Sequence, residues 1–572
     1  MRKTLLQIFG FLLIAVEVSA ATGRVGDFAL IDHKGEFHQL SRYADHKAVV
    51  LLVHANSCAS TLELTPEFLA LADTYADQSI AFLMLNAMPD ENRESIRLAA
   101  EHKGIDIPIL VDQSQLVAES LGLSVAGEVL VINPARMELL YRGAMSREHS
   151  ASARLDKDSL YLDEVLQALL SDQPVPVETI KARGIPIPMT ALDASHERHI
   201  SYVEDIAPIL ERRCVSCHRE GGVAPWAMSS HQMVRGWSTM MRETLLTRRM
   251  PPGQIDPLDI DRFEDVHHIT DQEMMTLIHW IDAGAVNDDD FDPLLSISPP
   301  ESEWALGEPD MVIDFPAQEI PATGVIDYKF VPVEIDIDRR RWVQAYEFDI
   351  GDKSVLHHVV AYTQDEKQQK QNASRGGSRS NFGGYAPGRE HMIFEEDTGV
   401  LLEPGMRFMI QFHYTTIGRQ STDRTRLGLY FSDKEPSRSL SRTAVMNGEF
   451  VIPPGVADYP VEAEAIIAND SYLYSFAPHM HYRGKRISFS AVFPDGRQEH
   501  LLGIPNFQHN WQMVYRLREP VFLPAGTRIE AKGGFDNSSL NPLNPDPGKE
   551  VRWGDQVWDE MFIAWMRISE DR

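Results

Sequence analysis

The pattern of apolar and polar positions divides the chain into three parts of different character. In the first part, apolar runs such as 48–54 alternate with stretches of helical period such as 62–75. Strands and helices in alternation predict an α/β layer fold, here over residues 21–172. A proline-rich stretch follows and predicts an extended linker over residues 173–198.

The middle part of the chain, residues 199–286, has helical periodicity and is predicted to form a small all-α domain. Its last helix is expected to begin at Thr270, where Glu273 completes a capping box, and to stop at Gly284. Residues 287–303 are acidic and contain proline, so a second linker is predicted there.

The third part begins at residue 304, where short runs rich in Val, Ile, Phe and Tyr alternate with turn residues. Regular short strands with few helical patterns predict antiparallel β-sandwiches. The length fits two of them, residues 304–436 and residues 437–572. The predicted fold is therefore multidomain: an α/β domain, a small all-α domain and two antiparallel β-sandwiches.

The start of the chain, residues 1–20, is predicted to be a signal peptide, with the positive pair Arg2–Lys3, an apolar run and cleavage after Ala20. An uncleaved anchor is the alternative, and no other segment is long and apolar enough to cross a membrane. The protein is therefore expected to be exported, to the periplasm or outside the cell. The formal net charge of −30 argues against nucleic acid as a partner. Three cysteines are too few for a disulfide scaffold.

A motif for covalent haem attachment lies in the helical part, at Cys214, Cys217 and His218. The two thiols can form thioethers with haem and the histidine can bind its iron, so we predict a c-type haem. The alternative is a Cys-x-x-Cys redox pair beside a chance histidine. Met250 is the favoured sixth ligand because two prolines follow it in an extended setting, a pattern that resembles small cytochrome c domains. His267–His268 are a rival pair.

A second set of candidate ligands lies in the β part and includes His479 and His481. In a strand both rings face the same side and Met480 faces the other. The remaining members are His357, His358, His413 and Met561. Five histidines and a thioether, without cysteine in these stretches, favour copper over zinc. In a regular strand His357 and His358 would point to opposite faces, so shared binding predicts a bend there or the use of different ring nitrogens.

The order of these residues resembles the type II copper, ascorbate-dependent monooxygenases, the family of peptidylglycine α-hydroxylating monooxygenase and dopamine β-monooxygenase. The resemblance runs from about Trp304 to the C-terminus and includes the motifs Gly384–Gly388, Trp511–Gln512 and Asp536–Ser538. It implies two copper ions, one held by His357, His358 and His413 and the other by His479, His481 and Met561.

The resemblance also implies a reaction. The second copper would activate O2, with His479, His481 and Met561 as the catalytic set, and the first copper would pass on an electron. The haem is expected to relay single electrons from a donor. It would either replace ascorbate or act together with ascorbate or another external reductant. The substrate would be a small molecule or a peptide. Ala477 and Trp565 stand where peptide-amidating members have an arginine and a tyrosine, so a glycine-extended peptide is not expected.

The α/β part carries a resemblance of its own. The stretch Val49–Cys58, followed by a helix, resembles the thioredoxin-like redoxins, with Cys58 at the strand-to-helix turn as a possible redox thiol. Thr61 stands in place of a second cysteine, and Ala55 in place of the threonine that precedes a peroxidatic cysteine. A retained scaffold that orients its neighbours is the alternative.

Two other functions compete with the monooxygenase hypothesis. One is a haem and copper protein for electron transfer or copper handling, without oxygenase activity. The other is a thiol oxidoreductase that acts through Cys58. His509, between Gln508 and Asn510, is expected to be structural.

Overall fold

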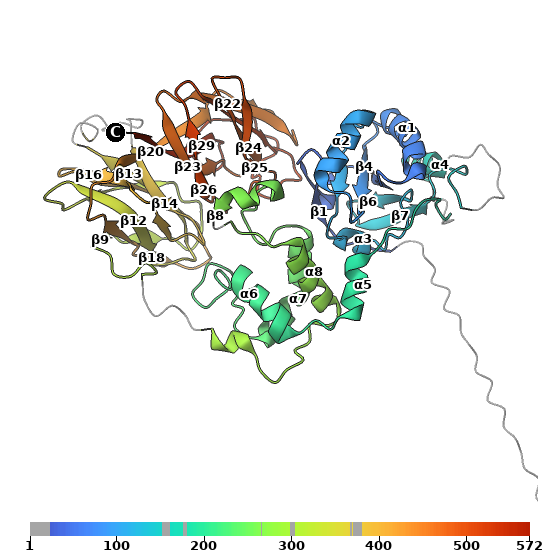
Figure 1. The fold of residues 1–572 in the computed structure, drawn as a ribbon, viewed down its shortest axis with the longest axis horizontal. Helices are drawn as coiled ribbons and strands as arrows, with labels where there is room; N and C mark the ends of the chain where they lie inside the picture. Colours follow the sequence, from blue (N-terminus) through green and yellow to red (C-terminus); the bar gives the residue numbers. More distant parts are fainter. Residues whose placement is uncertain are drawn as a thin grey trace, which may run out of the picture. The chain divides into compact units, whose positions relative to one another are not determined.

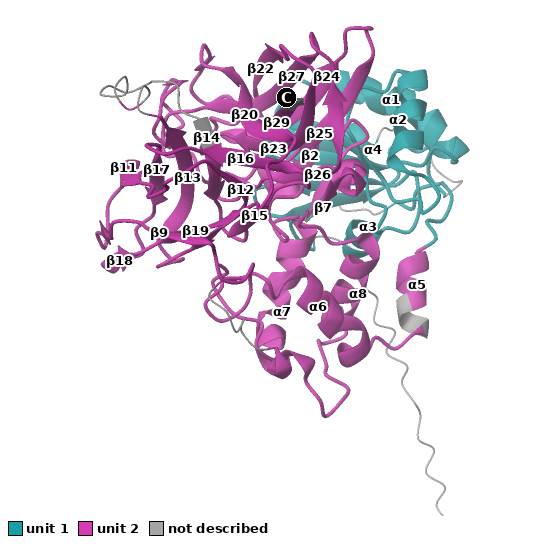
Figure 2. Ribbon diagram, turned by 60° about the vertical axis from the view of Figure 1, so that its left-hand side comes forward, with its two compact units in different colours: residues 1–27, 43–188 teal, residues 28–42, 189–572 magenta. Residues whose placement is uncertain are grey.

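The computed structural model describes residues 23–151, 161–175, 180–264, 266–297, 304–365, 369 and 380–571, so the predicted signal peptide 1–20 lies outside the described residues. The chain forms two compact units (Figure 2), residues 1–27 with 43–188 and residues 28–42 with 189–572. Among the described helices, none has the length and apolar character needed to cross a membrane.

The first unit is built on a five-stranded sheet in the order β5-β4-β3-β6-β7 (Figure 1). Strands β3 to β5 are parallel and β6 and β7 are antiparallel to their neighbours. Every residue of β3 is buried, as its continuous apolar run predicts. The elements are β3 Ala48–Val53, α1 Ala59–Thr74, β4 Ile80–Asn86, α2 Arg93–Lys103, β5 Ile109–Val111, α3 Leu116–Ser120, β6 Val129–Asn133, β7 Glu138–Gly143 and α4 Tyr161–Leu170. The α/β prediction is confirmed.

The predicted linker 173–198 is ordered structure over much of its length, and the prediction is wrong there. Ala126 N donates to Ile185 O at 2.9 Å, and Ala144 N donates to the carbonyl oxygen of Ile180 at 2.8 Å. Proline lacks a donor, but its neighbours can still pair with an extended segment. This segment therefore packs on the first unit, and helix α5, Thr190–Glu197, follows it.

The second unit begins with the β1–β2 hairpin and continues with short helices. The helical residues surround a stack of Tyr202 on Trp280, whose ring centroids are 5.8 Å apart. The predicted capping box is present, since Glu273 N donates to Thr270 Oγ1 and Thr270 N donates to Glu273 Oε2. The elements are β1 Ala29–Ile31, β2 Phe37–Gln39, η1 Leu40–Tyr43, η2 Tyr202–Ile206, α6 Ala207–Arg213, α7 His231–Leu246, η3 Pro257–Arg262, β8 Phe263–Glu264, α8 Asp271–Asp282 and η4 Pro293–Ser296.

The β part of the second unit has two apolar cores, and the N-terminal core includes Leu440 and Tyr474 from beyond the predicted boundary at 436/437. The N-terminal core lies between the sheet β11-β17-β13-β14 and strands β9, β19 and β12. The strands on this side are β9 Met311–Asp314, β10 Gln318–Ile320, β11 Lys329–Glu334, β12 Arg341–Asp349, β13 Leu356–Gln364, β14 Ser380–Tyr385, β15 His391–Ile393, β16 Thr398–Leu402, β17 Arg407–Tyr414, β18 Ser421–Asp423 and β19 Arg426–Phe431.

The C-terminal core lies between the sheet β22-β27-β24-β25 and strands β26, β23, β29 and β20. The strands are β20 Arg438–Asn447, β21 Val451–Ile452, β22 Tyr459–Ile466, β23 Ser471–His479, β24 Gly484–Val492, β25 Gln498–Ile504, β26 Tyr515–Leu523, β27 Arg528–Phe535, β28 Val551–Arg552 and β29 Phe562–Asp571. Short antiparallel strands around two cores agree with the sandwich prediction.

One feature of the β part differs from two independent sandwiches. A parallel pairing of β16 with β20 joins their outer strands into a ten-stranded sheet. The two-residue strand β8 of the helical part pairs with β26 and extends the same sheet. The parts predicted as three domains are thus connected by backbone hydrogen bonds, which local periodicity does not reveal.

Candidate functional site

The first histidine set is formed by a bulge in β13. The pairing of β13 with β17 shifts register between Leu356 and His358, and His358 lies opposite His413. A bulge turns neighbouring side chains toward one face. As a result His358 Nδ1 lies 3.1 Å from His357 Nδ1 and 3.2 Å from His413 Nδ1. The three histidines can offer ligand atoms that all lie within 4.8 Å of one another, so the predicted bend is confirmed.

These three rings are neutral at neutral pH. Burial, followed by the nearby imidazoles, lowers the pKa of His413 to about 2 and that of His358 in the same direction. Burial also lowers the pKa of His357. His357 Nε2 donates to Asn510 Oδ1 at 3.2 Å, which leaves Nδ1 with its lone pair. Metal-binding histidines commonly donate their other N–H in this way, and only the neutral ring binds metal.

The second histidine set lies at the end of β23. His479 Nε2 and His481 Nε2 are 3.3 Å apart, and Met480 is fully buried in the core, so the predicted facing is confirmed. The Nδ1 atom of His479 donates to Gln512 Oε1, and that of His481 donates to Asp559 O. Burial lowers the pKa of His481 to about 3 and lowers that of His479 as well. Two neutral rings therefore converge through Nε2.

A buried carboxylate, Glu560, fixes the backbone around this second set. His481 N donates to Glu560 Oε2 at 2.9 Å and Arg483 N donates to Glu560 Oε1 at 2.6 Å. Burial raises the pKa of Glu560, but both of its oxygens accept a backbone N–H and Arg483 adds a positive charge, and these contacts favour the ionised form. Met561 follows directly and precedes β29. One carboxylate thus ties the His481 turn to the predicted sulfur ligand, a role that sequence reasoning missed although Glu560 directly precedes Met561.

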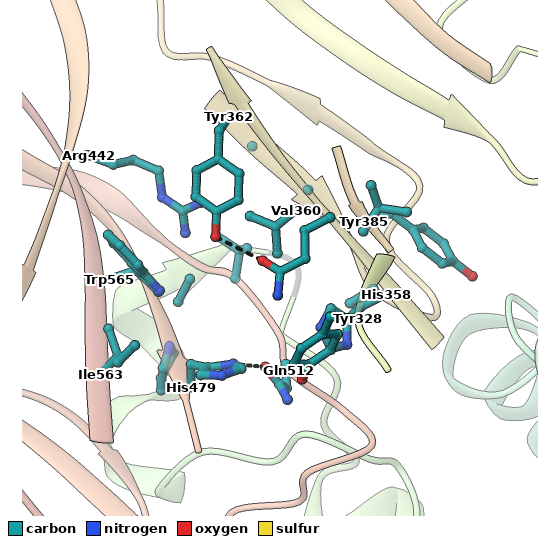
Figure 3. A pocket seen from close by; sticks show the side chains of 18 of the residues that line it. Tyr328, His358, Val360, Tyr362, Tyr385, Arg442, His479, Gln512, Ile563 and Trp565 are labelled. Atoms are coloured by element: carbon teal, nitrogen blue, oxygen red, sulfur yellow. Dashed lines mark hydrogen bonds between the residues drawn. The ribbon is translucent and has the colours of Figure 1, made fainter. Parts of the chain in front are cut away.

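One histidine of each set, His358 and His479, lines a single cavity of about 1060 Å³ (Figure 3). The ring centroids of His358 and His479 are only 6.5 Å apart. Met561, Ala477 and Trp565 also line the cavity, so the structure brings the predicted second set and both positions expected near the substrate to the same space.

His509 lies between the two sets and was missed as a site residue. Its ring is stacked on His357 at 5.5 Å between centroids and stands edge-on to His481 at 6.2 Å. Its Nδ1 donates to Met480 O at 3.2 Å. Within the described residues, its Nε2 is buried without a hydrogen-bond partner. The prediction of a structural histidine was therefore too narrow, and the available signal was a third imidazole two residues from the Trp511–Gln512 motif.

The haem-attachment residues lie after α6, where Cys214 caps the helix. Burial raises the pKa of Cys214 to about 12 and raises that of Cys217, so neither is a thiolate at neutral pH, which argues against a dithiol redox pair. His218 Nδ1 donates to Trp226 O at 3.1 Å, and burial lowers the pKa of His218. A neutral ring with its Nε2 lone pair fits a haem iron ligand.

Met250 lies at a bend in the loop between α7 and η3 and is half-buried. The loop is held at Gly253, whose carbonyl oxygen accepts from the Tyr515 hydroxyl at 3.0 Å. The role of Met250 as an iron ligand stays a prediction, and so does that of the rival pair His267–His268.

Cys58 is the N-cap residue of α1, as expected, and is only 1% exposed. The preceding turn is held by Glu91, which accepts from Asn56 N at 2.8 Å and from Ser57 N at 2.9 Å. Thr61 Oγ1 donates to Ala55 O at 2.7 Å. These hydrogen bonds hold the turn that precedes α1, and the Cys58 thiol in it is buried.

The buried imidazoles predict an acid-sensitive fold in the metal-free protein. The unfolded chain protonates its histidines near pH 6.5, whereas burial in the fold lowers the pKa of His413 to about 2 and that of His481 to about 3. Below pH 6.5 the unfolded state therefore binds more protons than the folded state, and the free energy of unfolding decreases as the pH decreases. In urea titrations, His413→Phe should reduce this slope by about 1.4 kcal/mol per pH unit. The exposed His391→Phe controls for the loss of one histidine, and an unchanged slope in His413→Phe contradicts the expectation.

Glu560→Gln should weaken metal binding at the second set by roughly 10- to 100-fold, because one of the two backbone N–H groups then faces an amide donor. Anaerobic copper titration measures this. Glu347→Gln is the matched control, since Glu347 is also buried and accepts from two backbone N–H groups, of Ala305 and Leu306, in the N-terminal core. Equal copper affinity in the two variants would show that Glu560 does not position the site.

Comparison with protein families shows that residues 22–139 match the AhpC/TSA family, so this part of the chain is a thioredoxin-like redoxin domain, as predicted. The comparison with curated proteins found no match.

Three solved structures illustrate similarity to part of the chain. A hypothetical protein from Sinorhizobium meliloti 1021 is 23% identical, with 30% of this chain and 96% of that chain covered and a TM-score of 0.28. Peroxidoxin BcpB from Mycobacterium tuberculosis is 19% identical over 26% of this chain and 94% of that chain, with a TM-score of 0.20. A putative thiol:disulfide interchange protein DsbE from Chlorobium tepidum is 15% identical over 26% of this chain and 97% of that chain, with a TM-score of 0.23.

Proposed function

We propose that this protein is an exported, copper-dependent monooxygenase that hydroxylates a C–H bond of an organic substrate with O2. The observation that carries the proposal is that two sets of neutral, converging imidazoles lie next to one cavity, which His358 of the first set and His479 of the second set line. The reaction is R–H + O2 + 2 electrons + 2 protons → R–OH + H2O, and the electrons come from an external one-electron donor. The chain's residues must hold two redox centres, admit substrate between them and exclude bulk water.

The donor atoms favour copper over zinc in the second set. Nitrogen donors from His357, His358 and His413 suit a copper that changes oxidation state, and the Met561 thioether adds a soft donor to the second set. When bound, copper supplies one-electron chemistry and a place for O2 to be reduced. Three protein ligands leave further positions open, a feature best attested in catalytic zinc sites. Gln512 and Asn510 orient a ring in each set, so one short segment aligns both.

The location of the haem-attachment residues supports an internal electron supply. A Cβ atom on Gly388 would lie 3.4 Å from Cys217 Sγ and 3.5 Å from the nearest carbon of His267. Gly388 follows β14, where Tyr385 pairs with Val359, the residue after His358. Haem attached at Cys217 supplies a one-electron carrier beside this loop. The route from Cys217 through the 385–388 loop leads to the first histidine set.

A second candidate function is thiol oxidoreductase activity through Cys58, and the match of residues 22–139 to the AhpC/TSA family favours it. The Cys58 thiol is only 1% exposed, so it would first have to become accessible. It would then attack a sulfur atom of a disulfide or an oxygen atom of a peroxide. This function and the monooxygenase can be separated by substitution, since they use different units of the chain.

The first test compares Met561→Leu with Met566→Leu in copper-loaded, haem-matured protein. Both replace a methionine by a side chain of similar volume near the start of β29, and Met566 belongs to the core. Met561→Leu should lower the affinity of one copper and the reductant-driven use of O2 by at least about tenfold, and Met566→Leu should leave both nearly unchanged.

Metal analysis and an oxygen electrode give the answer. Two coppers and one haem per chain are expected. One haem without stoichiometric copper, or O2 use that is indifferent to Met561→Leu, contradicts the monooxygenase. Activity that is lost in Cys58→Ser and retained in Met561→Leu assigns the function to the redoxin domain instead.

The haem route is tested with Gly388→Asn against Gly418→Asn. The two glycines have nearly the same φ, +81° and +82°, so the backbone strain is matched, but no atom lies within 4 Å of a Cβ at Gly418. Asparagine is among the residues that best tolerate positive φ. Stopped-flow absorption of the haem should show slower reoxidation only in Gly388→Asn, with an unaltered haem spectrum in both. Equal rates in the two variants would exclude this loop as the route.

A further inference from the structure

The wall of the cavity changes its chemistry along β29. Met561, Ile563, Trp565 and Arg567 all line the cavity, as alternate residues of a strand share one face. On the neighbouring strand β23, Ala477 lies opposite Trp565. Figure 3 shows His479, Ile563, Trp565 and Arg442 following one another along this wall. The wall is metal-binding at one end, apolar in the middle and basic at the other end.

The basic end is formed by two arginines on paired strands. Arg442 of β20 is the cross-strand partner of Arg567, and both line the cavity. The Arg442 guanidinium lies 5.5 Å from the centroid of the Trp565 ring. Arg567 is buried, donates to Phe382 O at 2.9 Å and keeps its remaining N–H groups for other partners. Two guanidinium groups thus approach the same region of the cavity.

Such a pair is unfavourable without a nearby anion, because like charges opposite each other on paired strands repel. Burial, followed by the charge of Arg567, lowers the pKa of Arg442 to about 10, so it is still cationic at neutral pH. Glu395 is a carboxylate that acts on Arg567, but it is shared with Arg516 at 3.8 Å. Both guanidinium groups therefore stand at this end of the cavity.

The acidic residues of the cavity lie at its other end. Among the described lining residues these are Asp327, next to Tyr328, and Asp555, whose charge acts on Tyr328. The Tyr328 ring packs against His413 at 4.9 Å between centroids. The two carboxylates thus lie near the histidines and the arginine pair lies at the far end, while a third lining arginine, Arg389, donates to Val514 O, two residues after Gln512.

We propose that Arg442 and Arg567 bind the carboxylate of the substrate, and that the substrate is an organic acid with an apolar body. The apolar part lies over Trp565, Ala477 and Ile563, and the C–H bond to be oxidised lies at the metal end. The six residue steps from Met561 to Arg567 span roughly 20 Å of strand, which sets an upper limit on the distance between the carboxylate and the reacting carbon. The hydroxylation of the bound acid rests on the proposed monooxygenase function. The binding of its carboxylate by the two arginines does not.

The test measures binding separately from turnover. Straight-chain carboxylic acids of increasing length, and the corresponding primary amides, are titrated calorimetrically into copper- and haem-loaded protein under anaerobic conditions. The wild type should prefer the acid by roughly ten- to hundredfold, as expected for charge-assisted hydrogen bonds. Arg442→Gln should remove most of this preference and Arg442→Lys should restore part of it.

Arg438→Gln is the matched control. Arg438 lies on the same strand, and its guanidinium covers the Tyr472 ring at 4.1 Å, away from the residues that line the cavity. It should keep the full preference for the acid. Equal binding of acid and amide by the wild type, or an unchanged preference in Arg442→Gln, overturns the proposal.

The same samples distinguish this failure from failure of the proposed function. An acid that binds through Arg442 but never raises O2 use or yields a hydroxylated product leaves the anion site standing and contradicts the monooxygenase. An amide that binds as tightly as the acid and is hydroxylated supports the monooxygenase and overturns the anion site.

Discussion

The interaction on which the candidate site depends most is the pair of backbone hydrogen bonds to the buried carboxylate of Glu560. His481 and Arg483 donate to its two oxygens, so one side chain fixes the turn after β23 to the start of β29. An unpaired charge at a fully buried position would be costly, and the turn is correspondingly hard to displace. Because Met561 is the next residue, the histidines and the sulfur are positioned by one constraint.

The same physics prepares the imidazoles for metal. Burial makes the protonated ring unfavourable, so His358, His413 and His481 are neutral and keep a lone pair at neutral pH. Hydrogen bonds from the other ring nitrogen then select which atom faces the cavity. Removing the rings from water lowers the stability of the metal-free fold at low pH, and it also leaves no proton on these rings for a metal ion to displace at neutral pH. The burial of these rings thus determines both the stability of the metal-free fold at low pH and the ability of the rings to bind metal.

The sequence was sufficient for features that depend on local pattern. Alternation in a strand predicted that Met480 would be buried opposite the two histidines. Shared binding by His357 and His358 predicted either a bend or the use of different ring nitrogens, and the bulge in β13 supplies the bend. It was insufficient for features made by distant segments. The parallel pairing of β16 with β20, the packing of Ile180–Pro188 and the place of His509 between the sets depend on contacts that no local periodicity encodes.

The distribution of reactive groups indicates where chemistry can occur without rearrangement. In the redoxin domain, Cys58 is covered and its turn is bonded to Glu91, so thiol chemistry requires local opening first. In the second unit, the cavity already contains imidazole lone pairs, an apolar wall and a charged end. Hydroxylation needs two electrons that arrive singly, and a carrier attached at Cys217, beside the loop that leads to His358, would deliver them without a reductant entering the cavity. The cavity would then need to hold only the substrate. A wall whose two ends differ in chemistry would favour one orientation of that substrate.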